Sequence, residues 1–102
     1  DDAGSLTIDK VRTTGTHKAH YAVHVGAVHN VLVRDLVVEN PVVHPLSVNT
    51  RSTRSVFLRA EVLQDAQIDQ HSGSNHQNLF DNLTMHVGAQ PSQTGWRWRL
   101  WE

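Results

Sequence analysis

The sequence has no cysteine, and this absence alone excludes several classes of protein. Disulfide bonds, thiolate metal sites and cysteine nucleophiles are all ruled out. Long apolar runs are missing too, since no stretch reaches the roughly 18 apolar residues of a membrane-spanning helix, and no membrane span is predicted. Lysine and arginine (9) nearly balance aspartate and glutamate (10), which leaves a net charge of −1. The broad basic surface that binds nucleic acid is therefore not expected.

The start of the chain carries no recognisable targeting signal. It begins Asp1-Asp2, without an initiator methionine and without a charged segment followed by an apolar one. We therefore expect a mature or excised piece from which a targeting segment has been removed. The length of 102 residues predicts a single domain spanning residues 1–102. Glycine-rich phosphate loops, Walker motifs and Gly-x-Ser-x-Gly elbows are absent, so no cofactor is predicted.

What the sequence does contain is an internal repeat, in which a small polar residue precedes a short apolar run. These segments begin at Ser5, Asn30, Ser55 and Asn78, so each lies about two dozen positions after the one before. A second series of strand-like segments is centred on Val23, Leu46 and Ile68, and it repeats at almost the same interval. Two series that share one period are typical of the coils of a parallel β-solenoid.

The composition of each repeat favours strands over helices. The apolar runs are short, rich in valine and bounded by Asn, Gly, Ser or Pro, and none keeps a period of about 3.6 residues over three turns. We predict an all-β fold, a right-handed parallel β-helix of about four coils around one apolar column. Asn30, Ser55 and Asn78 should stack at one corner, where their side chains bond the turn backbone. A β-sandwich or jelly roll is the alternative, but neither requires a shared period.

Three segments carry a resemblance to a known superfamily: residues 29–36 (HNVLVRDL), 54–59 (RSVFLR) and 77–83 (QNLFDNL). Their form resembles successive coils of the right-handed parallel β-helix proteins of the pectate-lyase-like superfamily, over roughly residues 5–87. That superfamily includes polysaccharide lyases, glycoside hydrolases, carbohydrate-binding modules, phage tailspikes and adhesins. The resemblance implies a polysaccharide partner and a secreted or cell-surface location. No motif of a particular lyase is present, so the resemblance assigns no catalytic residue.

A cluster of polar side chains is predicted on the second strand of each coil. If the series centred on valine 23 points inward, alternation places His24, Ser47 and Asp69 on the outer face, about 5 Å apart on adjacent coils. The next outward set includes Asn49 and His71. A histidine beside a carboxylate can perform general acid–base chemistry on a glycan. The candidate catalytic residues are therefore His24, Asp69 and His71, with Ser47 and Asn49 as substrate-binding residues; the alternative is a solvated outer face.

Two further residues are candidate substrate contacts. Arg51 follows the strand that carries Ser47 and Asn49, and a guanidinium can grip a sugar carboxylate through two parallel hydrogen bonds. Trp98 belongs to a C-terminal segment that holds all three tryptophans. An indole ring can stack on a sugar, although the segment could instead cap the open end of the coil stack.

A metal site is not predicted, despite the eight histidines. His20 and His24 share a strand face, but they lie about 13 Å apart along it. That separation is too large for one ion, because zinc holds its ligands at about 2.1 Å.

Three functions fit these observations. The first is an extracellular carbohydrate-active module that acts on or binds polysaccharide, with lysis of an acidic polysaccharide as its sharper form; whether the chain is an enzyme stays open. The second is a non-catalytic carbohydrate-binding module. The third is a structural segment of the adhesin or tailspike kind. The open ends of a short coil stack also predict end-to-end homo-oligomers.

Overall fold

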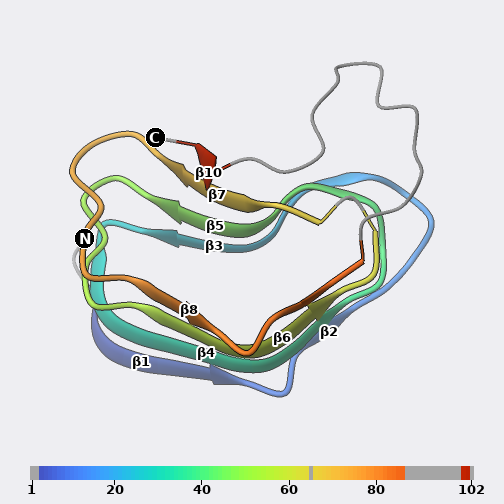
Figure 1. Cartoon of the computed structure of the whole chain (residues 1–102), viewed down its shortest axis with the longest axis horizontal. Helices are drawn as coiled ribbons and strands as arrows, with labels where there is room; N and C mark the ends of the chain where they lie inside the picture. The colour runs from blue at the N-terminus through green and yellow to red at the C-terminus, as the bar shows by residue number, and fades with distance from the viewer. Residues whose placement is uncertain (1–2, 65, 87–99, 102) are drawn as a thin grey trace.

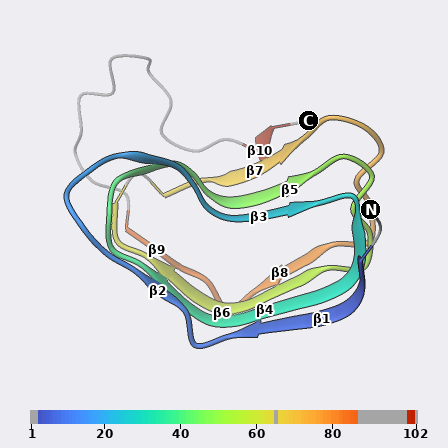
Figure 2. The same cartoon turned by 180° about the vertical axis from the view of Figure 1, so that it is seen from behind.

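The protein is a parallel β-solenoid of about three coils, close to the predicted number. The structure is a computed structural model, and it describes residues 3–64, 66–86 and 100–101. Every regular element in that part is a strand, and every strand pairing is parallel. The predicted all-β parallel β-helix is therefore confirmed (Figures 1 and 2).

Two walls of stacked strands face each other across the core (Figure 1). The first wall contains β1 (Ala3–Asp9), β4 (Val28–Val38), β6 (Val56–Val62) and β8 (Leu79–Asp81), with β2 (Arg12–Thr13) beside β4 and β9 (Thr84–Met85) beside β6. The second wall contains β3 (Ala19–Gly26), β5 (Val42–Asn49), β7 (Ile68–His71) and β10 (Leu100–Trp101), and β10 follows β7 in the stack. Each coil crosses the first wall, turns a corner and returns along the second.

The predicted alignment of the second wall is confirmed, and that of the first wall needs a correction. Val23, Leu46 and Ile68 are direct partners on β3, β5 and β7. On the first wall, Leu32 pairs with Val56, which places Asn30 one residue out of line with Ser55. The prediction that these two residues stack is wrong, because the spacing between partners on this wall falls by one position at each coil (9 to 34, 32 to 56 and 56 to 79). The predicted alignment kept that spacing equal over the first two coils.

Unequal corners account for this shrinking period. The first corner leads from the end of the first wall to the middle of the second. Its three copies are residues 13–23, 38–46 and 62–68, and each is shorter than the one before by two residues. The second corner leads from the end of the second wall to the next first-wall strand. Its copies are residues 26–32, 49–56 and 71–79, and each is longer than the one before by one residue. Because these changes occur only at the corners, the walls stay in register.

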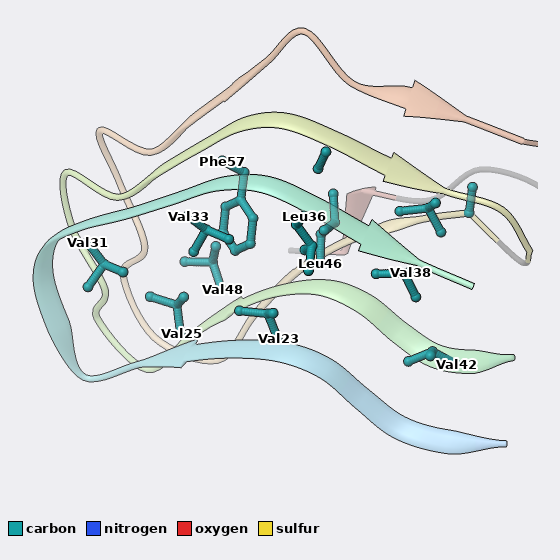
Figure 3. Close-up of a cluster of buried hydrophobic side chains, with 13 residues drawn as sticks. Val23, Val25, Val31, Val33, Leu36, Val38, Val42, Leu46, Val48 and Phe57 are labelled. Carbon is teal, nitrogen blue, oxygen red and sulfur yellow. The ribbon is translucent and has the colours of Figure 1, made fainter. Parts of the chain in front are cut away.

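The core is a column of aliphatic side chains with one aromatic pair. Side chains from both walls reach into the space between them (Figure 3). Phe57 has no exposed surface and stacks on Phe80 of the next coil with ring centroids 5.2 Å apart. The column is less covered at its ends, where Leu6 in the first coil is 48% exposed and Leu79 in the last is 53% exposed.

Left-handed backbone recurs at three aligned places in the coils. One set comprises Ser5, Asn30, Arg54 and Gln77, a second comprises Lys10, Asp35, Arg59 and Asn82, and a third comprises Ala27, Thr50 and Ser72, all with φ between 49° and 65°. Asn and Asp tolerate this conformation, whereas arginine and lysine adopt it at a cost. The same backbone strain recurs at matching positions because each coil must follow the bend of the coil beneath it.

Side-chain amides bond the backbone at the second corner, which confirms the predicted role of Asn78 but not that of Ser55, whose buried hydroxyl has no hydrogen-bond partner among the described residues. The Asn78 carboxamide accepts a hydrogen bond from the Ser55 N–H at 3.0 Å and donates to the Ser52 carbonyl at 3.1 Å. The Asn75 carboxamide accepts from the Ser52 N–H at 3.0 Å. These bonds join neighbouring coils and satisfy turn groups that the strand ladder does not reach.

Ion pairs link neighbouring coils along the outer bend of the first wall. Arg59 grips Asp35 through two hydrogen bonds of 2.6 and 3.0 Å, and Arg34 bonds Asp9 at 3.0 Å. The hydrogen bond from Arg59 lowers the pKa of Asp35 below its usual value and correspondingly raises the pKa of the guanidinium. Arg12 forms a further pair with Glu39.

Replacing Phe57 with alanine tests whether the column is the main source of stability. We expect the free energy of unfolding to fall by about 3–5 kcal/mol, since the side chain is fully buried. Leu79→Ala is the control on the partly open last coil and should cost about 1 kcal/mol or less. Urea denaturation followed by circular dichroism measures both, and equal losses would contradict this packing.

Candidate functional site

A hydrogen-bonded ladder crosses three neighbouring coils on the second wall. His24 pairs with Ser47 and Ser47 pairs with Asp69 in the strand register, as predicted. His24 Nδ1 lies 3.1 Å from Ser47 Oγ, and Ser47 Oγ donates to Asp69 Oδ2 at 2.8 Å. The three candidate residues therefore form one connected chain of side chains rather than three separate surface groups.

The ladder is more buried than the prediction of a solvated outer face allowed. Ser47 and Asp69 are 0% exposed, whereas His24 is exposed. The prediction that all three residues face solvent is therefore wrong for Ser47 and Asp69. Their polar atoms are hydrogen bonded within the ladder. The exposed His24 is the member of the ladder that a large ligand can reach from solvent.

His44 lies beside the carboxylate end of the ladder. Its Nδ1 atom lies 3.5 Å from Asp69 Oδ2 and 3.4 Å from the Gln67 side-chain amide nitrogen. When protonated, the imidazole can pair with the Asp69 carboxylate; when neutral, its Nδ1 lone pair can accept a hydrogen bond from the Gln67 amide. Asp69 thus has two polar neighbours on the preceding coil, Ser47 and His44, and a buried carboxylate requires such partners.

Aromatic rings gather on the same outer face. The Tyr21 ring lies 4.6 Å from the His24 ring and stacks on the His44 ring, with centroids 5.4 Å apart and planes inclined by 28°. His20 meets His44 edge-on at 5.1 Å. Tyr21 keeps 37% of its surface exposed. We call Tyr21, His24 and His44 the ring cluster; it spans the first two coils of the second wall.

Asn49 and His71 lie further along the strands than the ring cluster. Asn49 is level with Gly26 and His71 in the strand register, and its side-chain oxygen accepts a hydrogen bond from the Thr50 hydroxyl at 2.7 Å. The side chain of His71 lies outside the described part of the structure, and so does the whole of Trp98. The structure therefore places the backbone of His71 and leaves Trp98 as a prediction.

Arg51 lies at the second corner, just after β5. It is exposed, has left-handed backbone with φ of 60°, and its side-chain stem lies close to Gly73 of the next coil. Arg54 is exposed at the same corner and bonds Gln77 at 3.4 Å. Within the described residues neither arginine forms an ion pair, in contrast to Arg12, Arg34 and Arg59.

An open cavity of about 330 Å³ lies beside the ladder, toward the first coil. His24 and Gly26 line it together with apolar side chains of the core column, including Leu6 and Val25. A methyl group added at Gly26 would lie only 2.8 Å from His24 Nε2. The glycine therefore leaves room for the imidazole ring at the edge of the cavity.

Over residues 3–64, 66–86 and 100–101, no group of three or more His, Asp or Glu side chains is placed to hold a metal ion. No helix in the described chain is long and apolar enough to cross a membrane. Comparisons with protein-family models, with curated proteins and with solved structures find no match.

Sequence reasoning missed Tyr21 and His44, although the signal for them was present. The two residues have the same spacing as Val23 and Leu46, and the structure pairs them directly. Applying that spacing two residues earlier along each strand would have placed the two rings together. Their contact with the buried ladder depends on side-chain direction, which the repeat does not specify.

Removing the carboxylate of Asp69 tests whether the buried ladder is a structural unit. In Asp69→Ala the fully buried Ser47 hydroxyl loses its acceptor, so we expect the free energy of unfolding to fall by about 1–3 kcal/mol. Asp81→Ala, at an exposed carboxylate on β8, is the control and should change it by about 0.5 kcal/mol or less. Urea midpoints that shift equally in both variants would contradict the ladder.

Proposed function

We propose that this chain is an extracellular carbohydrate-binding β-helix module that binds polysaccharide on the outer face of β3 and β5. The observation that carries the proposal is the ring cluster. Tyr21, His24 and His44 lie side by side across two coils, and the tyrosine keeps a large exposed area.

The chemistry of these rings matches the two kinds of surface that a sugar presents. The flat faces of a pyranose carry C–H groups that pack on an aromatic ring, and its rim carries hydroxyl groups. Tyrosine combines an apolar ring with a polar hydroxyl, and histidine nitrogens donate or accept hydrogen bonds. A rigid sheet holds the rings in place, which reduces the entropy lost when a ligand binds.

An acidic polysaccharide is the preferred ligand within this proposal. Arg51 and Arg54 lie at the corner that follows β5, with no ion pair among the described residues. A free guanidinium can bind a sugar carboxylate in bidentate fashion. The paired arginines of the other bend are already occupied by Asp9, Glu39 and Asp35.

Binding is favoured over lysis because of the position of Asp69. A residue that exchanges protons with a bound glycan must touch it, and the carboxylate of Asp69 has no exposed surface. His24 remains an exposed imidazole on this face, so lyase activity is the alternative and is measured in the same assay. A structural segment is the other alternative, which the exposed Leu6 and Leu79 at the ends of the stack favour.

A panel of neutral and uronate-containing polysaccharides tests the proposal by isothermal titration calorimetry. We expect binding to at least one polymer, and a loss of about tenfold in affinity for Tyr21→Ala, equivalent to about 1.4 kcal/mol. Tyr21→Phe keeps the ring and should retain most of the affinity, while His86→Ala, on the opposite wall, should leave it unchanged.

The same mixtures distinguish the alternatives. Release of unsaturated uronate products, seen by ultraviolet absorbance, would establish a lyase instead of a binding module. Absence of binding to every polymer, together with concentration-dependent oligomers in analytical ultracentrifugation, would replace the proposal with a structural role.

Arg51→Gln tests the preference for acidic ligands. We expect the affinity for uronate polymers to fall about threefold to tenfold, because a charge-assisted hydrogen bond is lost, with no change for neutral polymers. Arg59→Gln is the matched control, since that guanidinium is engaged by Asp35 at the other bend. Equal losses for both polymer classes would overturn the role of Arg51.

A further inference from the structure

The donor and acceptor roles along the ladder determine which nitrogen of the His24 imidazole carries the hydrogen. Ser47 has a single hydroxyl hydrogen, and it points to Asp69 Oδ2 at 2.8 Å. An ionised carboxylate only accepts hydrogen bonds, so the reverse arrangement is not open to it. Toward His24, Ser47 Oγ therefore acts as an acceptor, and the hydrogen in the 3.1 Å contact belongs to Nδ1 of the imidazole.

A neutral imidazole carries one N–H, so a hydrogen on Nδ1 leaves Nε2 with a free lone pair. This is the opposite of the tautomer that free histidine prefers in water. The Nε2 atom lies above Gly26, where the absence of a side chain leaves it room, and both residues line the cavity next to the ring cluster. A fixed hydrogen-bond partner on one imidazole nitrogen is a common way to determine what the other nitrogen does.

We propose that Ser47 and Asp69 are positioning residues that hold His24 as its Nδ1–H tautomer, so that Nε2 accepts a hydrogen bond from a ligand hydroxyl. The ligand part of this inference rests on the proposed function, and the tautomer part does not. It assigns His24 the role of an acceptor on the binding face. Neither Ser47 nor Asp69 needs to touch the ligand, which agrees with their complete burial.

The tautomer is measured directly by two-bond proton–nitrogen correlation spectra of the full chain labelled with ¹⁵N-histidine. The spectra are recorded near pH 8, where imidazoles are ordinarily neutral. His24 is assigned by the signals that disappear in His24→Gln. We expect a protonated Nδ1 and a non-protonated Nε2 in the ligand-free protein. A protonated Nε2 in the unmodified chain would overturn the proposal, whatever the variants do.

Ser47 variants test whether the ladder is the cause. Ser47→Ala removes the acceptor, and we expect His24 to change to the Nε2–H tautomer; Ser47→Thr keeps a hydroxyl and should retain Nδ1–H. Ser74→Ala, at an exposed serine of the second corner, is the control and should leave the signals unchanged. Retention of Nδ1–H in a folded Ser47→Ala variant would contradict the role of Ser47. If that variant does not fold, the spectrum of the unmodified chain still decides.

Calorimetry with the best polymer of the panel tests the ligand part. Ser47→Ala should bind about threefold to tenfold more weakly than Ser47→Thr, since one hydrogen bond is lost. Equal affinities of these two variants would overturn the acceptor role of Nε2. An Nδ1–H tautomer in a chain that binds no polymer would refute the proposed function and leave the ladder intact. Tyr21-dependent binding with an Nε2–H tautomer would refute this inference alone.

Discussion

The whole structure depends on backbone hydrogen bonds that hold each coil level with the next. Parallel pairing fixes which residues become neighbours, and a shift by a single residue would turn every side chain of a strand to the opposite face. The aliphatic column, the Asp35–Arg59 pair and the His24 ladder all join residues that lie one coil apart in the sequence. None of these contacts would form with another strand register. The packing of the core and the geometry of the outer face therefore depend on the same register.

That constraint gives the outer face of the second wall a character unlike that of an ordinary solvated sheet. Strand stacking places the Ser47 hydroxyl next to the Asp69 carboxylate, and the hydroxyl donates a hydrogen bond to that carboxylate in a buried position. The rings of Tyr21 and His44 then lie alongside this polar ladder. A buried polar ladder with satisfied partners rigidifies its surroundings, so the exposed rings are presented on a firm base. Rigid aromatic groups above satisfied polar groups suit recognition better than chemistry that must move protons through Asp69.

Much of the fold could be predicted from the sequence because valine-rich runs recur, and the series Val23, Leu46 and Ile68 located the second wall with the correct register. The first wall was placed one residue out at Asn30, since a small polar residue can stand on either side of a bend. The contacts between His24, Ser47 and Asp69 followed from register alone. Their burial did not, because it depends on side-chain packing that a repeat does not describe.

The lengths of the two corners change in opposite directions along the stack. The first corner loses two residues at each coil, and the second corner gains one. The number of residues can thus differ between coils at the corners, whereas it is fixed by strand pairing within the walls. Residues 14–18 belong to the longest of the first corners, so we expect an insertion there to leave the strand register of the walls unchanged. Sequence changes that alter chain length would then collect at the bends and spare the walls, so that diverse loops and a constant outer face can coexist in one small solenoid.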